Sequence, residues 1–559
     1  MKNNKNYEYN EVEKVTTIRE IMDKAGIQAG DKIAFKYKEG NDIKEVKYNE
    51  FIEDIFSLGT ALSKNNIAST HVAVVGENSY KWLTVYLTIL ESNGVIVPID
   101  KELPLQDMIN ILNDSDSEVL FYADKYEKHI DELKAKAPKI KYFIGFSREE
   151  DGEKVLSYNK LIESGRKDYK AGDKIFTSIE HKDLNKLKML VYTSGTTGNA
   201  KGVMLSEKNL VGIVYHGLRI STVYSRCLSV LPYHHTYEAV AGILVSLHHH
   251  SCICINENIK MTVNNLKLYK PDYIYLVPAF VELFYKKIWT NAKETKKDVA
   301  LKIMIKVSNF LRIFGIDLRK KLFKSIHEAF GGNLIKIVTG GAPIRAELGI
   351  FFDSIGIDLI NGYGITECSP LVSANRDYFN DCATVGVLLP CVEVKFENVT
   401  PEGDGEILVK GDTVMLGYYK NEKLTAEVLK EGWFYTGDYG KMNDKGQLLI
   451  TGRKKNLIVL ENGKNVFPEE IENYIMGIPY VTEVVVRGIK NEAGAETGLL
   501  AEVFLNEEKL NELNITNKEE SLKQDISTAC RELPIYKKIT KIIIRDEQFN
   551  KTTTNKIKR

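Results

Sequence analysis

Short apolar runs that suit buried β-strands alternate with longer segments of helical periodicity over most of this chain. Residues 48–62 carry apolar side chains at helical spacing, the run 72–76 has the pattern of a buried strand, and a helical segment over 82–90 comes next. Strands that alternate with helices of about 10–15 residues form parallel β-units with helices on both faces of a sheet. We therefore predict an α/β fold in which sheets are covered by helices. Further strands are predicted at 94–99, 119–123, 273–277 and 334–338.

The pattern changes near Gly446, where short strands and turns replace the long alternation. The Asn462-Gly463 dipeptide suits a hairpin turn, and a helix is predicted from Pro468 to Ile475 because proline is favoured at the first helical position. A chain of 559 residues exceeds one ordinary hydrophobic core. We therefore predict a large N-terminal domain over 1–452 and a smaller, mobile α+β domain over 453–559. The strands predicted in this part are 447–451, 457–460, 484–486, 499–505 and 542–544.

Charge and cysteine content narrow the class of protein. Lys+Arg and Asp+Glu both number 76, so no overall charge attracts nucleic acid or an anionic membrane, although local patches remain open. The seven cysteines are scattered and odd in number, which favours a reducing compartment over a disulfide framework. The N-terminus lacks an apolar signal core, and no run reaches the roughly 18–20 apolar residues of a membrane span. We predict a cytoplasmic protein without nucleic-acid partners, and peripheral contact with the inner face of the membrane stays open.

A loop rich in glycine and hydroxyl side chains, Tyr192–Gly202, follows an apolar run that ends at Tyr192. Glycine loses the most backbone entropy on folding, so such a loop needs a compensating role. Phosphate binding is such a role, because the backbone N–H groups and hydroxyls of the loop can wrap around phosphates. The Walker A spacing fails because Ala200 stands before Lys201 and glycine follows it, and an ordinary turn is the alternative. The residues predicted to bind phosphate are Thr193, Ser194, Gly195, Thr196, Thr197, Gly198 and Lys201.

Four further motifs follow this loop. In order they are Asn361-Gly362-Tyr363-Gly364-Ile365-Thr366-Glu367, Tyr435-Thr436-Gly437-Asp438, Gly452-Arg453-Lys454-Lys455 and Lys551-Thr552-Thr553-Thr554-Asn555-Lys556. Together with the loop they resemble the AMP-forming adenylating enzymes, which include acyl-CoA synthetases, luciferases and peptide-synthetase adenylation domains. Within that family, the stretches 452–466, 235–238 and 277–280 and the long insert between 288 and 332 are most similar to long-chain fatty acid CoA ligases.

The resemblance implies a role for each motif in joining a carboxylate to the α-phosphate of ATP. Glu367 would bind the Mg²⁺ that bridges the phosphates, because Mg²⁺ takes hard oxygen ligands. Lys556 would bridge the attacking carboxylate and the α-phosphate, although Asn555 stands where the family usually has glycine. His235 would gate or position the acyl group. Further implied contacts are Thr366 with the α-phosphate, Tyr363 with adenine, Gly364 with the nucleotide, Gly341, Ala342 and Pro343 with the nucleotide and acyl group, Asp438 with the ribose, Arg453 with the ribose or a phosphate, and Gly463 and Lys464 with CoA.

These residues also have structural interpretations that the sequence leaves open. Glu367 could be a solvated surface carboxylate, and Asp438 could be a turn aspartate after glycine. Lys556 could belong to a frayed basic end of the chain. His235 could be a buried, hydrogen-bonded histidine. Lys455 stands where the family keeps the hinge between its domains, but it could also be an ordinary solvated lysine.

The resemblance implies ATP-dependent activation of a long-chain fatty acid to acyl-AMP, followed by transfer of the acyl group to CoA. ATP, Mg²⁺ and CoA are the implied cofactors, and pyrophosphate and AMP are the implied products. A ligase that loads acyl carrier protein and a stand-alone adenylation enzyme are alternatives, because they share the first half-reaction; we expect no carrier domain after Lys556. An inactive lipid- or nucleotide-binding relative is the alternative outside enzymes. The intact residues Thr366, Glu367, Asp438, Arg453 and Lys556 speak against it.

The segment 300–330 is basic, with seven Lys/Arg and two Asp/Glu. One interpretation is a helix that packs its apolar side chains into the core and exposes a basic face. The other is a helix that lies on a membrane surface and collects fatty acids. The apolar residues at helical spacing are Ile303, Val307, Phe310, Leu311 and Phe314.

Overall fold

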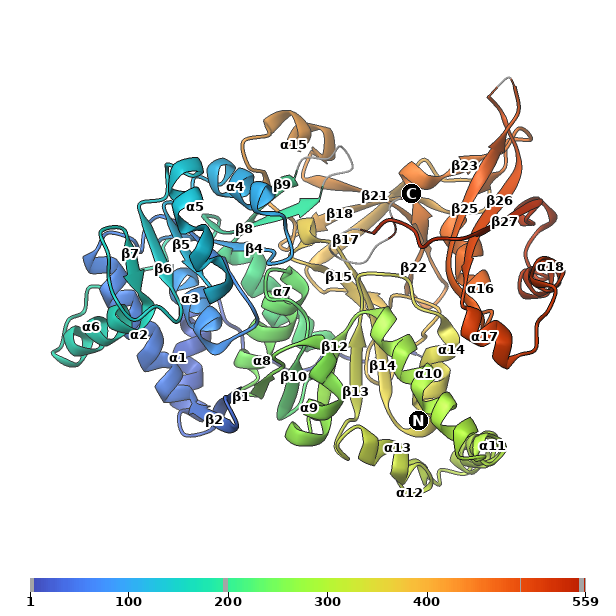
Figure 1. The fold of residues 1–559 in the computed structure, drawn as a ribbon, viewed down its shortest axis with the longest axis horizontal. Coiled ribbons are helices and arrows are strands. Elements are labelled where there is room, and N and C mark those ends of the chain that lie inside the picture. Colours follow the sequence, from blue (N-terminus) through green and yellow to red (C-terminus); the bar gives the residue numbers. More distant parts are fainter. Residues whose placement is uncertain (1–4, 195–199, 493, 552–556, 558) are drawn as a thin grey trace. The chain divides into compact units, whose positions relative to one another are not determined.

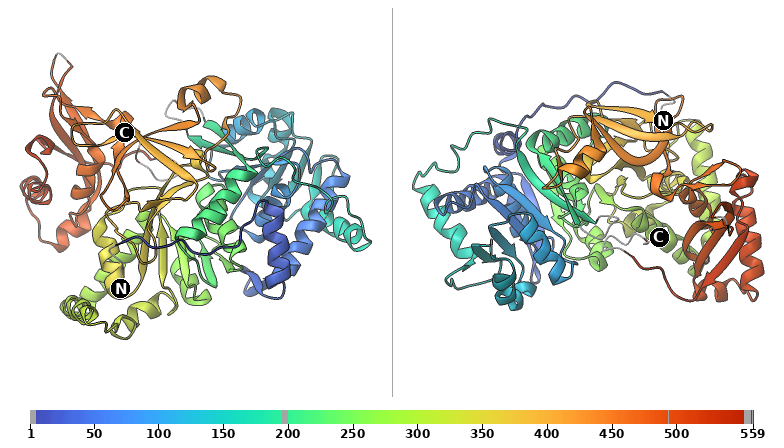
Figure 2. Two further views of the ribbon diagram at one scale, coloured as in Figure 1. Left: turned by 180° about the vertical axis from the view of Figure 1, so that it is seen from behind. Right: turned by 90° about the horizontal axis from the view of Figure 1, so that it is seen from above.

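The computed structural model describes residues 5–194, 200–492, 494–551, 557 and 559 (Figure 1). The chain forms two compact units. The C-terminal part of the chain gathers in a body of its own, drawn in orange and red (Figure 2). The domain boundary at 452/453 stays a prediction. The first unit comprises Met1–Ala342, Ala346–Glu393 and Lys410–Phe434, and the second unit comprises Pro343–Arg345, Val394–Val409 and Tyr435–Arg559.

An eight-stranded sheet in the first unit has the order β19-β9-β8-β4-β3-β5-β6-β7. The strands from β8 to β7 are parallel neighbours, and β9 turns back antiparallel to β8. The strands predicted at 72–76, 94–99 and 119–123 are confirmed as β3, β4 and β5. The bounds are β3 His71–Val75, β4 Val95–Ile99, β5 Val119–Tyr122, β6 Tyr142–Gly145, β7 Val155–Ser157, β8 Leu187–Ser194, β9 Ala200–Ser206 and β19 Gly417–Tyr418.

A nine-stranded sheet, also in the first unit, has the order β16-β15-β14-β13-β12-β10-β11-β1-β2. Its central strands from β14 to β1 are parallel, and antiparallel strands complete both edges. Because the carboxyl ends of parallel strands meet at one edge of a sheet, the turns after β13 and β14 lie next to each other. The bounds are β1 Ile33–Glu39, β2 Asp42–Lys47, β10 Arg226–Ser229, β11 Cys252–Ile255, β12 Tyr273–Leu276, β13 Lys336–Thr339, β14 Asp358–Gly364, β15 Leu371–Ala374 and β16 Val387–Leu388.

Helices cover these sheets, and their apolar faces form the core. In α2, the predicted helical face is buried through Phe51, Ile55 and Leu58, because residues three and four apart lie on the same side of a helix. Within the described part of the chain, no helix combines the length and the apolar character needed to cross a membrane. The bounds are α1 Ile18–Ala29, α2 Tyr48–Lys64, α3 Tyr80–Leu90, α4 Leu105–Asp114, α5 Ile130–Lys136, α6 Tyr158–Lys170, α7 Glu207–Ile220, α8 Val245–His248, α9 Thr262–Tyr269, α10 Pro278–Glu294, α11 Asp298–Ile313, α12 Arg319–Leu322, α13 Lys324–Ala329, α14 Ala346–Ile355 and α15 Glu422–Val428.

The second unit is a small α+β body with its own core. In its three-stranded sheet, β25 pairs antiparallel with β26, and β26 pairs parallel with β27. The predicted helix is confirmed as α16 Pro468–Ile475, which packs Ile471 and Ile475 into a core shared with the sheet. The other helices are α17 Glu507–Glu512 and α18 Lys518–Ala529. The strands are β25 Val481–Lys490, β26 Glu496–Leu505, β27 Lys541–Arg545 and the hairpin pair β23 Ile458–Val459 and β24 Asn465–Val466.

A five-stranded sheet contains the motif around Asp438. Its strands have the order β17-β18-β21-β20, and β22 pairs with β21. The bounds are β17 Val392–Glu397, β18 Gly405–Gly411, β20 Leu429–Lys430, β21 Trp433–Met442 and β22 Leu448–Arg453.

Candidate active site

The predicted phosphate loop connects two antiparallel strands of the first unit. β8 ends at Ser194 and β9 begins at Ala200, with Thr193 paired with Lys201 across the hairpin. The loop therefore follows a strand, as the apolar run before it predicted. The Thr193 hydroxyl is buried without a hydrogen-bond partner in the described part of the chain, and an unpaired buried hydroxyl is costly unless a ligand satisfies it. The predicted residues Gly195, Thr196, Thr197 and Gly198 lie outside the described residues.

Lys201 and Glu367 meet at the base of this hairpin. The Lys201 ammonium donates to Glu367 Oε1 at 2.9 Å and to Tyr418 Oη at 2.6 Å. The Tyr418 hydroxyl donates in turn to the same Glu367 oxygen at 2.8 Å. The Lys201 Nζ also lies 4.3 Å from the centre of the Tyr418 ring, within the range of a cation–π contact. Two residues that the motifs assign to ATP and its metal are thus brought together, across 166 residues of sequence.

Tyr418 reaches this cluster because its strand is paired with the hairpin. In the β19–β9 pairing, Tyr418 stands opposite Val203, and the backbone N–H of Tyr419 donates to Gly202 O at 2.8 Å. The N–H of Met415 donates to the carbonyl of Glu367 at 2.9 Å. The segment 415–419 therefore joins the hairpin to the turn that carries Glu367. Sequence reasoning missed Tyr418, since no motif spacing marks it.

The cluster holds Glu367 ionised. Burial alone would raise the pKa of its carboxyl group, but the Lys201 charge and the hydrogen bonds from Lys201 and Tyr418 together lower that pKa below its usual range. The side chains are 28% exposed for Lys201 and 13% exposed for Glu367. The interpretation of Glu367 as a solvated surface carboxylate is therefore wrong, because the group is largely buried and doubly hydrogen-bonded.

Thr366 and Glu367 follow β14 after one residue, Ile365, in the short helical turn Thr366–Cys368. Tyr363 and Gly364 are the last residues of β14 and pair with the antiparallel strand β15. A Cβ on Gly364 would lie 1.9 Å from the Pro370 carbonyl oxygen, so only glycine fits at this position. The close approach fixes the path of the backbone that leads to Glu367.

The turn after β13 lies beside the turn after β14. A Cβ on Gly340 would lie 3.1 Å from the Gly362 carbonyl oxygen and 3.9 Å from the Tyr237 ring, and the Tyr237 hydroxyl donates to Val338 O at 3.1 Å. Gly341 follows with a positive φ of 81°. Gly341 and Ala342 belong to the first unit and Pro343 to the second. The three residues predicted to contact the nucleotide and acyl group are therefore divided between the two units.

His235 stands at the start of an unusual helix. Its backbone N–H donates to Pro232 O at 3.1 Å, its side chain is half-buried, and its ring centre lies 4.1 Å from that of His234. The π-helix Tyr237–Leu244 follows, a form found mostly as short insertions at functional sites. Within it, burial raises the pKa of the Glu238 carboxyl to about 8, although Ser229 donates a hydrogen bond to it. The gating role of His235 stays a prediction.

In the second unit, Asp438 and Arg453 form a cross-strand ion pair. They stand opposite each other on β21 and β22, and Arg453 Nε lies 2.9 Å from Asp438 Oδ1. The N–H of Asp438 donates to the Thr436 hydroxyl at 3.0 Å. Asp438 therefore lies within a strand, and the interpretation as a turn aspartate is wrong. A buried carboxylate beside an exposed guanidinium suits recognition of a ribose or a phosphate.

The predicted CoA contacts Gly463 and Lys464 close the β23–β24 hairpin. Gly463 has a positive φ of 75°, and its N–H donates to Leu460 O at 2.7 Å, which confirms the predicted turn. The Lys464 ammonium lies 3.2 Å from Glu402 Oε1. The lysine is half-exposed at the tip of a short hairpin, a position that leaves it accessible to a ligand.

Lys556 lies outside the described residues, but both flanks of its motif are held by the second unit. The Lys551 ammonium lies 2.5 Å from Glu483 Oε1, and Phe549 is buried with its N–H donating to Glu483 Oε2 at 2.8 Å. On the other side, Arg559 forms an ion pair with Glu472 on α16. These anchors weaken the interpretation of the C-terminus as a frayed basic tail.

The donor set in the first unit fits the implied Mg²⁺. In the part of the chain that the structure describes, no three His, Cys, Asp or Glu side chains are grouped to hold a metal. Mg²⁺ bound with nucleotides commonly takes only one or two carboxylates and completes its shell with phosphate oxygens and water. Glu367 supplies such a hard, ionised oxygen ligand at the base of the predicted phosphate loop.

Two family models together match most of the chain. The family model described as AMP-binding enzyme matches residues 22–419, and the model described as AMP-binding enzyme C-terminal domain matches residues 455–559. The long-chain-fatty-acid–CoA ligase FadD15 of Mycobacterium bovis is 30% identical over 445 residues, which cover 75% of this chain and 71% of that protein. The chloroplastic long-chain-fatty-acid–[acyl-carrier-protein] ligase AEE15 of Arabidopsis thaliana is 28% identical over 594 residues, covering 92% of this chain and 78% of that protein.

Solved structures share the fold. The anthranilate CoA ligase AuaEII, determined with anthranoyl-AMP, superposes with a TM-score of 0.76 at 18% identity, covering 99% of this chain and 96% of that one. O-succinylbenzoate coenzyme A synthetase from Bacillus subtilis, determined with AMP, gives a TM-score of 0.71 at 19% identity, with 96% of both chains covered. At such identities the likeness concerns the fold alone.

Proposed function

Because this chain belongs to the AMP-binding enzyme family, we propose that it activates a long-chain fatty acid as acyl-AMP and transfers the acyl group to CoA. The single observation that carries the proposal is the Lys201–Glu367–Tyr418 cluster at the base of the phosphate-loop hairpin. It places a cation, an ionised carboxylate and an unpaired threonine hydroxyl next to one loop. Such a set recognises a polyphosphate with a divalent metal.

In the first half-reaction, a carboxylate oxygen of the fatty acid attacks the α-phosphorus of ATP, and pyrophosphate leaves. Two anions must meet, so the site has to spread and neutralise charge while it aligns the attack. Lys201 and the loop residues 193–198 hold the β- and γ-phosphates, and Thr366 contacts the α-phosphate. Glu367 holds Mg²⁺, which supplies positive charge to the phosphates when it is bound.

The remaining first-unit residues orient the nucleotide and the acyl group. Tyr363 stacks on adenine, and the turn Gly340–Ala342 lets flat groups lie against bare backbone. His235 borders the acyl group. Burial raises the pKa of the neighbouring Glu238 carboxyl to about 8, which favours its neutral form at neutral pH and suits an apolar substrate.

The second unit supplies the ribose contacts and the cation at the reacting bond. Asp438 accepts from the ribose hydroxyls, and Arg453 adds a donor. Lys556 bridges the fatty-acid carboxylate and the α-phosphate. In the second half-reaction the thiolate sulfur of CoA attacks the acyl carbon and AMP leaves, with Gly463 and Lys464 beside the pantetheine. A change of backbone angles at Lys455 would let the small domain serve each half-reaction in turn.

The acyl acceptor has one specific alternative. The relative from Arabidopsis that covers 92% of this chain is named as a ligase for acyl carrier protein, while FadD15 is named as a CoA ligase. Both acceptors present the same pantetheine thiol, so the chemistry of the second step is unchanged. CoA is favoured because Lys464, a half-exposed cation at the tip of a short hairpin, could exchange its ion pair with Glu402 for the phosphates of a small ligand.

The test is the identity of the products. The purified protein is given ATP, Mg²⁺, palmitate and CoA, and the nucleotide and acyl products are separated. We expect AMP, pyrophosphate and palmitoyl-CoA. ADP as the nucleotide product would rule out adenylation, and faster turnover of acetate or an aromatic acid than of palmitate would rule out the long-chain substrate. The same assay with acyl carrier protein in place of CoA identifies the acceptor, because the true acceptor should receive the acyl group faster.

A further inference from the structure

Helix α11 exposes an apolar stripe. Phe310 is 59% exposed, and Ile313 and Phe314 are 74% and 65% exposed. The Phe310 and Phe314 rings lie edge to face with their centres 5.2 Å apart. Residues three and four apart lie on one side of a helix, so these side chains form a continuous strip along the helix. The stripe consists of Val299, Ile303, Val307, Phe310, Ile313 and Phe314.

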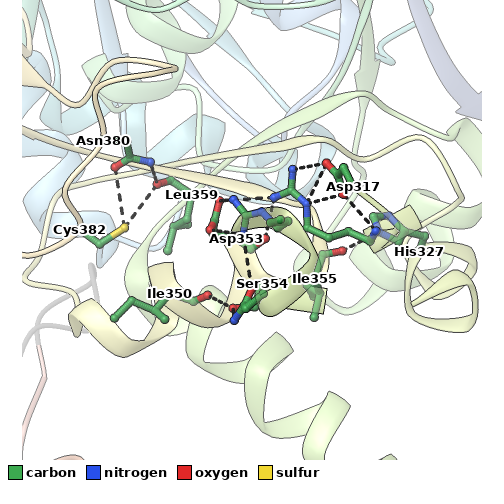
Figure 3. A network of polar contacts seen from close by, with 12 residues as sticks. Asp317, His327, Ile350, Asp353, Ser354, Ile355, Leu359, Asn380 and Cys382 are labelled. Carbon is green, nitrogen blue, oxygen red and sulfur yellow. Dashed lines mark hydrogen bonds and ion pairs between the residues drawn. The ribbon is translucent and has the colours of Figure 1, made fainter. Parts of the chain in front are cut away.

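The opposite face of α11 is the one that packs against the protein. Leu301 and Ser308 are its buried residues. Arg312 Nη1 lies 2.9 Å from Asp353 Oδ2 on α14, and Asn309 Nδ2 donates to Ser354 Oγ at 3.1 Å. Figure 3 shows the α14 side of this network, with Asp353 and Ser354 pointing toward their partners. These polar contacts therefore hold α11 against α14 within the first unit.

The segment after α11 is fixed to the same helix. Arg319 donates to the Asp353 carbonyl oxygen at 2.8 Å and binds Asp317, and His327 on α13 contacts Ile355 O at 2.8 Å (Figure 3). The stripe is thus held on an anchored scaffold. Of the two sequence interpretations, burial of Ile303, Val307, Phe310 and Phe314 in the core is wrong.

Exposed lysines lie on α11 and on the short helix that follows it. Lys306 stands one turn from both Ile303 and Phe310, and Lys320 and Lys321 follow on α12. All three are exposed and make no ion pair with any residue that the structure describes. The two acidic residues of the segment 300–330 are Asp317 and Glu328, and each has a basic partner, Arg319 and Lys324. The segment 300–330, which carries most of the stripe, therefore has a net positive charge.

We propose that α11 lies on an anionic phospholipid membrane. Its stripe enters the boundary between headgroups and acyl chains, while the lysines bind headgroup phosphates and keep their ammonium groups in water. The charge favours this occupant over a second copy of the chain, because two copies would bring like-charged lysines together. An apolar patch rimmed by cations has its complement in an apolar layer with an anionic surface. Docking there would place the protein where fatty acids partition.

Binding to vesicles tests this proposal without any catalytic step, so its failure and the failure of the proposed function are distinguishable. The full chain, without ATP or CoA, is sedimented with phosphatidylcholine vesicles that contain or lack phosphatidylglycerol, at low and at high salt. We expect binding to the anionic vesicles that weakens with salt.

Two variants separate the apolar and the charged contributions. Phe310→Ser with Phe314→Ser should lower the partition coefficient by on the order of tenfold or more, through lost apolar insertion. Lys306→Gln with Lys320→Gln and Lys321→Gln should lower it by on the order of a hundredfold at low salt and by less at high salt. The matched controls are Ile27→Ser with Ile535→Ser and the triple exchange of Lys423, Lys445 and Lys523 for Gln, all at exposed positions outside the segment 298–330.

The proposal is overturned if the parent protein does not bind anionic vesicles, or if the controls lose as much binding as the α11 variants. It is also overturned if sedimentation shows a dimer that the phenylalanine variant dissociates while vesicle binding is unchanged. That outcome would assign the stripe to contact between copies. Circular dichroism and thermal melting of each variant establish that the fold is retained.

Discussion

Each compact unit joins a basic and an acidic residue of the motifs, but the two pairs are built differently. In the first unit, the Lys201 and Glu367 side chains are both largely buried, and Tyr418 bonds to both. In the second unit, the Asp438 side chain is 3% exposed while that of Arg453 is 47% exposed. One pair is largely buried and bridged by a tyrosine hydroxyl, and the other joins a buried acid to a half-exposed base.

Under the proposed function, the difference would give two ways to receive a nucleotide. Lys201 and Glu367 form an ion pair with each other, so ATP would have to take the lysine and Mg²⁺ the carboxylate before the site could work. Binding there would exchange an internal ion pair for contacts with the ligand. Asp438 stays in its strand, and the exposed guanidinium of Arg453 can turn toward the ligand at little cost. The first pair should therefore control the chemistry of the phosphates, and the second the affinity for the nucleoside.

We expect the largest effect from Lys556→Ala, which should affect the two half-reactions differently. Both reacting groups are anionic in the first half-reaction, so loss of this cation should slow acyl-AMP formation by on the order of a hundredfold or more. With preformed acyl-AMP and CoA, the variant should form thioester at close to the parent rate, because the attacked carbon already carries a good leaving group. Both half-reactions are measured separately; intact adenylation, or equal collapse of both with normal folding, would contradict the assigned role.

The next test replaces each of the two acids, Glu367 and Asp438, with its amide. Glu367→Gln should lower the adenylation rate by about ten- to a hundredfold and raise the Mg²⁺ concentration needed for half-maximal rate, because a neutral amide is a weaker Mg²⁺ ligand. Asp438→Asn is the matched control in the other unit. It should chiefly raise KM for ATP and leave the Mg²⁺ requirement unchanged. The same Mg²⁺ dependence in both variants would remove the distinction between the two pairs.

Lys455 tests whether the second unit changes position between the half-reactions. Lys455→Pro restricts φ and should slow thioester formation by about tenfold while adenylation falls less, if this residue is the hinge. Lys455→Ala removes the side chain but keeps the backbone free, so it should leave both steps near the parent. The measurement is the single-turnover rate of each step in both variants. Equal losses in both steps of the proline variant would show that the hinge is not at Lys455.

The smallest effect is expected from Tyr418→Phe, which removes one hydrogen bond to Glu367. The carboxyl pKa is held below its usual range in part by this bond, so the variant should raise that pKa. The acid limb of kcat/KM for ATP should then move to higher pH, since the ionised form is lost earlier as pH falls. The rate at neutral pH should fall only a few-fold, as for loss of one hydrogen bond to a charged group.

Tyr419→Phe is the control, because the Tyr419 hydroxyl donates to Asp116 Oδ2 at 2.7 Å and not to Glu367. An acid limb that moves equally in both variants would show that Tyr418 does not act through Glu367.

Local patterns predicted the elements of the fold well. The helix Pro468–Ile475 was predicted to the residue because proline marks its first turn. The Asn462-Gly463 turn closes a hairpin because glycine accepts a positive φ there. The short apolar run that ends at Tyr192 predicts a strand before the phosphate loop, and β8 is that strand.

Contacts over long sequence separations could not be predicted in this way. Tyr418 meets Lys201 across 217 residues, and nothing in its neighbours marks it. The helical spacing in α11 showed that its apolar residues share a face, but spacing cannot say whether that face points inward. The structure decides this through Arg312 and Asn309, polar residues that bind α14 and turn the apolar stripe outward.

The central claim is that this chain forms acyl-AMP before any thiol is present. A single-turnover experiment tests it directly, with enzyme in excess over ATP labelled in the α-phosphate, and with Mg²⁺ and palmitate but no CoA. The account predicts that the label moves into palmitoyl-AMP with release of pyrophosphate, and that later addition of CoA converts this species to palmitoyl-CoA and labelled AMP. Label that stays in ATP until CoA is added, or that appears in ADP, would contradict the account.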